Sequence, residues 1–276
     1  MDRRDLNVCY EQLGFAEAPF RMTPDTDYFF RAPQHLHALE HLQFGIASGE
    51  LAMLTGEVGV GKTLVCRYLM RHPPKGVRFA YLLNPDQSYV DLLGSICRDL
   101  TGQVPEARSI GVLQRTLSHV LLQLAGRSER VAVLVDEAHR LSGKVLEGLR
   151  LLSNLDTEKE KLMCLLLVGQ PELERTLSHR VLRPLAQRIS IRFRLKPFDC
   201  WETMEYIRHR LRVADPRTRF QFPPCVMMLT HYLSGGVPRR INQICHRSLL
   251  AAFASHRFEV SLRMVLRAKR EITGLT

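Results

Sequence analysis

An eight-residue segment of the chain, Gly56–Thr63, has the composition of a phosphate-binding loop. Its sequence, Gly-Glu-Val-Gly-Val-Gly-Lys-Thr, matches the pattern G-x-x-x-x-G-K-T. Glycines let the backbone turn so that several N–H groups point into one concavity, and a following helix adds partial positive charge there. Lys62 would reach the β- and γ-phosphates of a nucleotide, and the Thr63 hydroxyl would coordinate Mg²⁺. The alternative, a chance glycine-rich turn, is disfavoured because an apolar run precedes the segment and a helical pattern follows it.

Two carboxylates directly follow the apolar run Val131–Val135. Asp136 would bind Mg²⁺, directly or through water, and Glu137 would orient and deprotonate an attacking water. The alternative is an acid pair that caps a helix after a buried strand. His139 completes the tetrapeptide D-E-A-H of helicases, but a helicase motor needs two such cores and the 276 residues hold one. The sequence favours a local hydrogen-bonding role for His139 over a catalytic one.

A third polar position follows another apolar run, Leu162–Val168. Gln170 would lie beside the γ-phosphate if its strand runs between the strands that carry the loop and Asp136. It is therefore a candidate γ-phosphate sensor. The alternative is a turn residue that caps a helix starting at Pro171.

Arginines at two places could also contact phosphate. Arg183 and Arg188 precede the run Ile189–Leu195, and either could reach the γ-phosphate of a neighbouring subunit and stabilise charge in the transition state. Arg188 is the first choice. Arg239 opens a helix after Pro238 and could reach back to nucleotide phosphate, whereas Arg240 is expected to face solvent or a partner.

The elements that must position these residues follow from hydrophobic periodicity. Short apolar runs predict strands at Leu51–Thr55, Arg78–Leu83, Val131–Val135, Leu162–Val168 and Ile189–Leu195. Helical spacing predicts helices at Thr63–Arg71, Tyr89–Leu100, Leu113–Leu124 and Val145–Leu155. This alternation indicates crossover units on a parallel sheet. The first four strands are nearly all apolar, so both of their faces should be covered. The fifth strand alternates apolar and polar residues, so one of its faces should be exposed to solvent.

No convincing strand follows Lys196. Asp199, with Glu202 three residues later, predicts a helix start, and helical patterns continue at Pro223–Leu233, Pro238–Ser255 and Ser261–Ile272. The fold class is therefore α/β, a parallel sheet flanked by helices and followed by a small all-helical domain. The expected division is an N-terminal segment and first helix packing on the core (residues 1–48), the core (49–197) and the helical domain (198–276).

Charge and cysteine content narrow the class of protein further. The net charge is +11, and it is concentrated from Lys196 onward, which permits nucleic acid, an anionic membrane surface or acidic proteins as partners.

The 7 cysteines are scattered without a C-x-x-C pair, so they predict buried thiols in a reducing compartment. The longest apolar run, Leu162–Val168, is far shorter than the roughly 20 residues of a membrane span. The N-terminus has no apolar signal core, so we expect a cytoplasmic protein.

Several motifs together resemble the AAA+ ATPases, and within them the bacterial general secretion pathway A (ExeA) group and its shorter MSHA pilus biogenesis (MshM) relatives. The resemblance runs nearly end to end. It rests on Phe15–Phe20, Thr23–Asp25, Tyr28–Phe30, Gly56–Thr63, Asp136–His139, Val168–Leu173, Gln187–Ile189 and Gly236–Asn242.

This resemblance implies a P-loop fold with strand order 5-1-4-3-2 and a helical lid. It implies a sensor role for Gln170, an arginine finger at Arg188 or Arg183, and a second sensor at Arg239. It also implies that Pro19, Phe20 and the segment to Phe30 border the adenine; the alternative, compatible with it, is that Phe20, Phe29 and Phe30 pack against the sheet. The nucleotide-binding residues would be Gly56, Glu57, Val58, Gly59, Val60, Gly61, Lys62, Thr63, Leu64 and Arg239, with Thr63 and Asp136 on the metal.

The expected function is that of a Mg²⁺-dependent ATPase that energises or regulates assembly of a secretion or type IV (MSHA-like) pilus system. Longer members of the group continue into a membrane span. Because no such span is expected in this chain, a transmembrane partner at the inner membrane is expected instead. A homo-oligomer is expected as well. Two alternatives remain open. One is a DNA-acting ATPase similar to transposition regulators, since Arg263, Arg267 and Arg270 are spaced to share a helix face. The other is a nucleotide-gated scaffold that scarcely turns ATP over.

Overall fold

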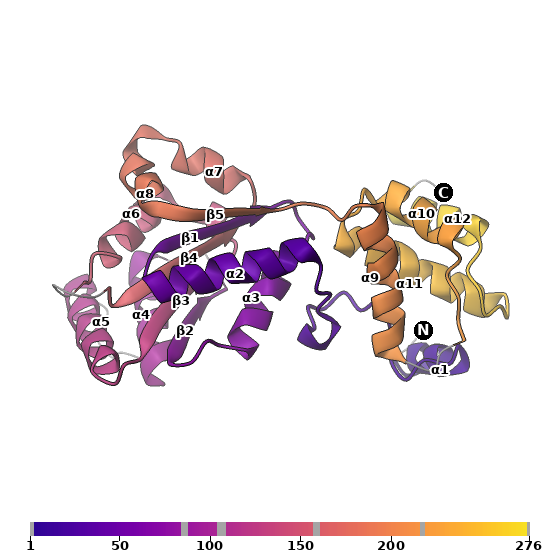
Figure 1. The fold of residues 1–276 in the computed structure, drawn as a ribbon, viewed down its shortest axis with the longest axis horizontal. Helices are drawn as coiled ribbons and strands as arrows, with labels where there is room; N and C mark the ends of the chain where they lie inside the picture. Colours follow the sequence, from indigo (N-terminus) through magenta and orange to yellow (C-terminus); the bar gives the residue numbers. More distant parts are fainter. Residues whose placement is uncertain (1–2, 84–87, 104–108, 157–160, 216–218, 275–276) are drawn as a thin grey trace. The chain divides into compact units, whose positions relative to one another are not determined.

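The computed structural model describes residues 3–83, 88–103, 109–156, 161–215 and 219–274; the remaining residues, Met1 and Asp2 among them, lie outside the described part. The chain forms two compact units (Figure 1). The sheet unit comprises Pro33–Val58 and Val65–Leu195, and the helical unit comprises Met1–Ala32, Gly59–Leu64 and Lys196–Thr276.

This division differs from the expected one at the N-terminus. Residues up to Ala32 group with the helical unit, and only the helix α2 (Pro33–Ser48) belongs with the sheet. The reason is aromatic burial: Phe15, Phe20 and Tyr28 are almost completely buried in the core of the helical unit. Local sequence patterns could not predict this grouping, because the partners of these rings lie some 200 residues later in the chain. Only the fold brings them together.

The sheet has five parallel strands in the order β2-β3-β4-β1-β5. This confirms the predicted fold class and strand order. The strand bounds are Leu51–Gly56 for β1, Val77–Leu82 for β2, Arg130–Val135 for β3, Met163–Gly169 for β4 and Ile189–Leu195 for β5.

Burial differs between the central strands and the edges. Every residue of β1 and β4 is buried, and in β3 only Arg130 is exposed, as the all-apolar sequences predict. The same prediction is wrong for β2, which forms one edge of the sheet: only Ala80 and Leu82 are buried, and Arg78 is exposed. At the other edge, β5 alternates buried residues with the exposed Ser190 and Arg192, as predicted.

Helices cover both faces of the sheet. In Figure 1, α2 lies in front of the sheet, where a Cβ on Gly45 would lie 3.1 Å from the Ala52 Cβ. Strand residues such as Met53, Val133 and Leu165 form one hydrophobic core with the helices that follow α3 (Lys62–Arg71) in the chain. The helices of this unit after α2 are α3 (Lys62–Arg71, whose first residues group with the helical unit), α4 (Tyr89–Thr101), α5 (Ile110–Ala125), η2 (Ala138–Arg140), α6 (Gly143–Leu152), α7 (Glu172–Leu177), η3 (Arg180–Leu182) and α8 (Arg183–Arg188).

Serine hydroxyls define where three of these helices begin. Ser88, Ser109 and Ser142 stand at the N-cap positions of α4, α5 and α6, and each side chain accepts the backbone N–H three residues later. Such caps satisfy N–H groups that the helix itself leaves free and contribute about 1 kcal/mol each. They fix where these three helices start.

The helical unit contains α1 (Arg3–Gln12), η1 (Thr26–Tyr28), α9 (Cys200–Ala214), α10 (Pro224–Ser234), α11 (Pro238–Ala254) and α12 (Leu262–Thr273). The predicted capping box is present at α9: the Glu202 N–H donates to the Asp199 carboxylate at 2.7 Å, and the Asp199 N–H donates to the Glu202 carboxylate at 3.1 Å. None of the helices in the described residues is both long enough and apolar enough to cross a membrane.

Aromatic contacts tie the N-terminal segment into this unit. Phe20 packs edge-on against Phe222 with ring centroids 5.8 Å apart, and Phe30 packs against Phe198 at 5.6 Å. Phe20 and Phe30 therefore pack in the core of the helical unit, whereas the alternative interpretation placed them against the sheet. Arg210, which is 3% exposed, stacks its guanidinium 4.1 Å from the Tyr28 ring centroid and donates to the Pro19 carbonyl at 2.6 Å. A buried arginine thus anchors the segment.

Five of the seven predicted buried thiols are buried; Cys200 is half-buried and Cys225 is exposed, and all seven are free.

Candidate active site

Three of the predicted site segments lie at one edge of the sheet. Gly56 ends β1, Asp136 follows β3 and Gln170 follows β4. Since β4 pairs in parallel with both β3 and β1, the carboxyl ends of the three strands are neighbours, with that of β4 in the middle. In open α/β sheets, ligands bind outside the carboxyl ends of the strands. The fold therefore gives Gln170 the central place that the sequence predicts for it.

The glycine-rich loop is a tight connection between β1 and α3. Gly59 and Gly61 adopt φ values of +84° and +109°, which L side chains rarely adopt, and Lys62 begins α3 with only 6% of its surface exposed. The loop also crosses between the two units, because Gly56, Glu57 and Val58 group with the sheet while Gly59–Leu64 groups with the helices. Such a turn ending in a helix start can cradle phosphate oxygens with backbone N–H groups.

Within the helical unit, Arg239 lies against this loop. Its backbone N–H donates to the Gly59 carbonyl at 3.2 Å, and a Cβ on Gly59 would lie 2.6 Å from the Arg239 Cβ. Position 59 thus requires glycine for two reasons: its backbone conformation and the close approach of α11. The Arg239 side chain itself is exposed.

Asp136 is 1% exposed, and protein donors occupy both of its carboxylate oxygens. Oδ1 accepts the Glu137 N–H at 2.9 Å, and Oδ2 accepts the Tyr81 hydroxyl at 3.2 Å. Burial, and then the nearby Asp136 carboxylate, raise the pKa of Tyr81 well above its usual value, so the hydroxyl remains a donor. Sequence analysis missed Tyr81; its place near the end of β2, next to β3, was the available signal.

Glu137, His139 and Gln170 form a contiguous polar group. The Gln170 backbone N–H donates to His139 Nδ1 at 3.4 Å, His139 Nε2 lies 3.0 Å from Gln170 Nε2, and Glu137 Oε2 lies 3.6 Å from His139 Nε2. Glu137 itself has φ +54°, which is rare for a residue with a side chain, and strained backbone of this kind clusters at functional sites. The hydrogen-bonding role that the sequence favours for His139 is thus seen in these contacts.

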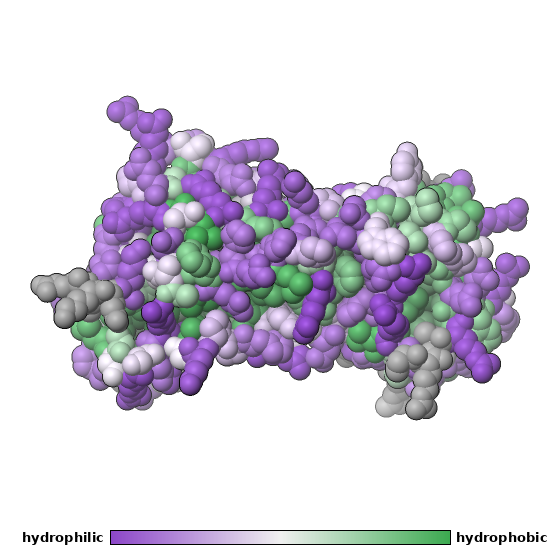
Figure 2. All heavy atoms as spheres, viewed as in Figure 1, coloured by the Kyte–Doolittle hydropathy of each residue, from purple (hydrophilic) through white to green (hydrophobic). Residues whose placement is uncertain are grey.

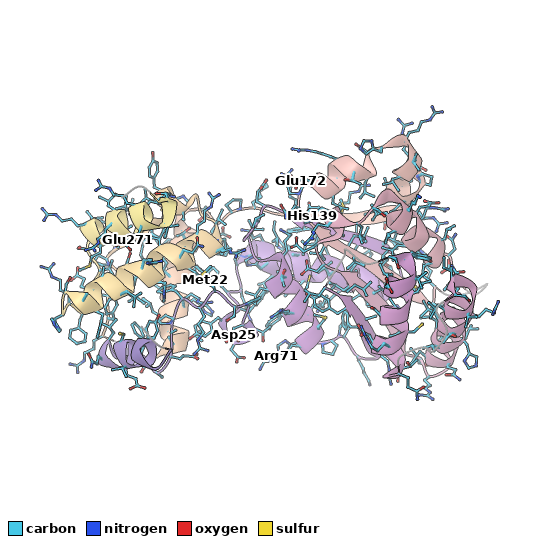
Figure 3. The ribbon with its side chains drawn as sticks, turned by 180° about the vertical axis from the view of Figure 1, so that it is seen from behind. Met22, Asp25, Arg71, His139, Glu172 and Glu271 are labelled. Carbon is cyan, nitrogen blue, oxygen red and sulfur yellow. The ribbon has the colours of Figure 1, made fainter. Side chains whose placement is uncertain are left out.

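Neighbouring elements hold this group in place. In Figure 3 the labelled His139, on η2, lies near Glu172, at the start of α7, close to where the strands end. A Cβ on Gly169 would come within 3.1 Å of the His139 backbone N, so η2 packs directly on the end of β4. On the next strand, the Thr55 hydroxyl donates to Glu174 of α7 at 2.5 Å. Sequence analysis did not single out Thr55 or Glu174.

Arg188 lies at the amino end of β5, whereas the residues described above lie where the strands have their carboxyl ends. It immediately precedes β5, whose seven residues extend about 20 Å at roughly 3.3 Å per residue. Its guanidinium donates to the Asn154 side chain and, at 3.4 Å, to the Ser153 hydroxyl, both between α6 and β4. Arg188 and Arg183 are both exposed. Within the sheet unit, Arg188 therefore cannot reach the edge that holds Asp136.

Comparison with known proteins agrees with this architecture. Residues 47–177 match the AAA domain family. The chain is 41% identical over 267 residues to general secretion pathway protein A of Aeromonas hydrophila, a match that covers 95% of this chain and 48% of that protein. The chain therefore spans about half the length of this curated relative.

Solved structures share the fold at lower identity. Cdc6p from Pyrobaculum aerophilum superposes with a TM-score of 0.69 at 18% identity, covering 90% of this chain and 71% of that one. The Aeropyrum pernix ORC1 protein in complex with DNA gives 0.66 at 19% identity, covering 89% and 67%. The chain thus carries an AAA domain and belongs with the relatives of general secretion pathway protein A.

Proposed function

We propose that this AAA-domain relative of general secretion pathway protein A binds ATP with Mg²⁺ at the carboxyl edge of its sheet and hydrolyses it. The observation that carries the proposal is the convergence of three strand ends. The phosphate-binding motif, the Asp136–Glu137 pair and Gln170 leave neighbouring parallel strands at one edge. Each supplies a different part of phosphoryl-transfer chemistry.

The residues at this edge fit a nucleotide and its metal. The positive φ values of Gly59 and Gly61 form a turn that can point N–H groups at phosphate, with contacts expected along Gly56–Leu64. Thr63 and Asp136 supply a hydroxyl and a carboxylate, the oxygen ligands that Mg²⁺ takes while retaining several waters. Bound ATP and Mg²⁺ would supply the phosphoanhydride bond to be cleaved and the charge that polarises it.

The remaining roles belong to side chains. Lys62 would balance charge on the phosphates, and Glu137 would orient the attacking water and accept its proton. Gln170 would donate to the γ-phosphate, and Arg239, whose backbone N–H bonds to the Gly59 carbonyl of the loop, would contact phosphate. Arg188, with Arg183 as the alternative, would stabilise the transition state on a second copy of the chain, because its place at the amino end of β5 excludes its own site. Full activity then requires a homo-oligomer.

We further propose that turnover energises or regulates assembly of a secretion or type IV pilus-like system, at the cytoplasmic side of the inner membrane and with a transmembrane partner. The name and identity of the Aeromonas hydrophila relative support the secretion role. The apolar surface over α10 and α12 supports a protein partner (Figure 2). Four large apolar side chains are exposed there: Met228, Tyr232, Leu262 and Leu266.

Calorimetric titration with ATP and Mg²⁺, followed by measurement of phosphate release, tests the enzymatic proposal. We expect saturable binding, turnover that rises with protein concentration as oligomers form, and loss of binding in Lys62→Ala. If the folded protein does not bind ATP, the proposal is wrong. Binding with phosphate release at the background rate would instead identify a nucleotide-gated scaffold.

A second candidate, a DNA-acting ATPase, is favoured by a basic hollow of about 590 Å³ at α11 and α12. Arg247, Arg257, Arg263 and Arg267 line it, with Glu271 as the acidic exception at 3.7 Å from Arg247 and 3.0 Å from Arg267. Of the three arginines that the sequence places on one helix face, Arg263 and Arg267 line the hollow, and Arg270 is exposed on the same helix. Guanidinium groups suit phosphate oxygens.

A salt series distinguishes this candidate. If the hollow binds duplex DNA, Arg263→Glu combined with Arg267→Glu should weaken binding and lower the slope of log K against log salt by about 2. Arg115→Glu with Arg127→Glu, two exposed arginines of the sheet unit, makes the same charge change and should leave both quantities near wild type. Equal effects of the two pairs, or ATP turnover indifferent to DNA, would remove the candidate.

A further inference from the structure

His139 is in contact with two side chains that have separate roles in the proposed reaction. Its Nε2 atom lies 3.0 Å from the Gln170 side-chain amide and 3.6 Å from the Glu137 carboxylate. Only 12% of the imidazole surface is exposed, against 37% of the Glu137 side chain. The ring is therefore held in place, while the carboxylate has room to move.

The hydrogen bonds of the ring determine where its proton lies. The Gln170 backbone N–H points at Nδ1, so Nδ1 is the acceptor, and in the neutral ring Nε2 carries the hydrogen. The Nε2–H then needs an oxygen as its partner. The Gln170 amide lies 3.0 Å away with its nitrogen toward Nε2, and a half-turn of the amide, which leaves its shape unchanged, presents the oxygen instead.

One N–H now has two potential acceptors. With its oxygen turned toward the ring, the Gln170 amide at 3.0 Å receives the hydrogen bond, and at 3.6 Å the Glu137 carboxylate lies beyond hydrogen-bond distance. A small movement of either side chain exchanges the two. The ring itself does not need to move, because η2 packs on Gly169 and the Gln170 backbone holds Nδ1.

We propose that His139 is a positioning residue that links the γ-phosphate sensor to the catalytic base. When the Gln170 side chain turns toward the γ-phosphate, it leaves the His139 N–H, which then donates to Glu137 and fixes the carboxylate for proton abstraction. No proton is transferred to or from the ring. This inference rests on the proposed function, because it assigns how Gln170 and Glu137 communicate during that reaction.

The test compares replacements that keep or remove a donor at the Nε2 position. His139→Ala removes the donor, and we expect kcat to fall 10- to 100-fold while KM and the Kd for ATP stay within about twofold. His139→Gln places an amide N–H near the Nε2 position and should retain at least one third of the wild-type kcat. His119→Ala, on the exposed face of α5 in the same unit, serves as the matched control and should not change kcat.

A readout without nucleotide examines the ring itself. Nitrogen NMR of the histidine rings, with the His139 signals identified from the His139→Gln spectrum, should show Nε2 protonated and Nδ1 bare. Thermal unfolding of the same variants checks that the fold is retained. The opposite tautomer would overturn the inference, because Nε2 could not then donate to either side chain.

The outcomes separate the two levels of proposal. Wild-type protein without turnover removes the proposed function and this inference with it. Wild-type turnover combined with an unchanged kcat in His139→Ala, or with an equal loss in His139→Gln and His139→Ala, removes the inference alone. A raised Kd for ATP in His139→Ala would assign the ring to nucleotide binding and would also overturn it.

Discussion

The two units bury polar groups for different purposes. In the sheet unit, the buried or half-buried polar side chains at the carboxyl edge bond to one another, as Tyr81 does to Asp136 and His139 does to Gln170. In the helical unit, buried polar groups anchor the fold: Arg210 donates to backbone carbonyls of the N-terminal segment, and the Tyr206 hydroxyl donates to Asn242 at 2.9 Å. The first arrangement can rearrange around a ligand, whereas the second serves to fix chain segments.

This difference predicts how the units respond to substitution. Changes at the carboxyl edge should alter chemistry with little effect on folding, because the side chains there bond mainly to one another rather than to the backbone of distant segments. Changes at tight packing points of the helical unit should alter stability, because nothing nearby can move at low cost.

The largest expected effect is at Glu137. Glu137→Gln keeps the size and polarity of the side chain but removes the base, so kcat should fall by about 10²–10⁴-fold. ATP binding by calorimetry and the unfolding midpoint should stay near wild type, because the carboxylate is part-exposed and no base is needed in the ground state. Turnover close to wild type would assign the base elsewhere and would break the contrast between the units.

Gly236 offers the converse test in the helical unit. It has φ +71°, and a Cβ there would lie 2.0 Å from the Phe198 carbonyl oxygen, so Gly236→Ala should lower stability by about 2–4 kcal/mol. Urea unfolding followed by the fluorescence of Trp201, the single tryptophan of the chain, which lies on α9, reports this unit.

The preceding glycine is the matched control for that substitution. Gly235 has a similar φ of +62°, but a Cβ there would meet nothing within 4 Å, so Gly235→Ala should cost only about 1 kcal/mol. Equal losses at the two positions would show that backbone conformation, rather than the close approach of Phe198, determines the cost.

The smallest expected effect is a loss of stability in acid, confined to the helical unit. Burial, reinforced by neighbouring arginines, lowers the pKa of His209 and His246 in the folded state. The unfolded chain therefore binds more protons below about pH 6.5, and stability falls as pH falls, by at most about 1.4 kcal/mol per pH unit for each histidine. Trp201 fluorescence in urea series from pH 7.5 to 5.5 measures this.

A substitution identifies the group responsible. Among the described residues, the His209 Nε2 is buried without a hydrogen-bond partner, and its ring packs near Phe30 and beside Arg210 and Arg212. His209→Phe should reduce the pH dependence by about one proton, whereas His256→Asn, at an exposed position of the same unit, should not. An unchanged pH dependence in His209→Phe would place the acid sensitivity elsewhere.

Local patterns were enough to predict most of the elements. The strand around Val131–Val135, the helix that begins after Asp199 and the alternating exposure of Ser190 and Arg192 all depend on side-chain periods of a few residues. The motif at Gly56–Thr63 is also local, because a loop that binds phosphate through its backbone must carry its glycines in one run.

Contacts between distant segments were not predictable in this way. Nothing in the spacing of Phe15 and Phe20 indicates that they pack against Phe220 and Phe222. The part-buried β2 was predicted to be covered on both faces because composition does not tell an edge strand from a central one.

The sequence by itself therefore determined the chemical groups available and the elements that carry them, because both are set by residues close together in the chain. The tertiary structure alone decided which groups meet. It placed His139 between Glu137 and Gln170, Tyr81 beside Asp136, and Arg188 at the far edge from them. The reason is physical: strand order and burial result from packing the whole chain at once, and no short segment carries that information.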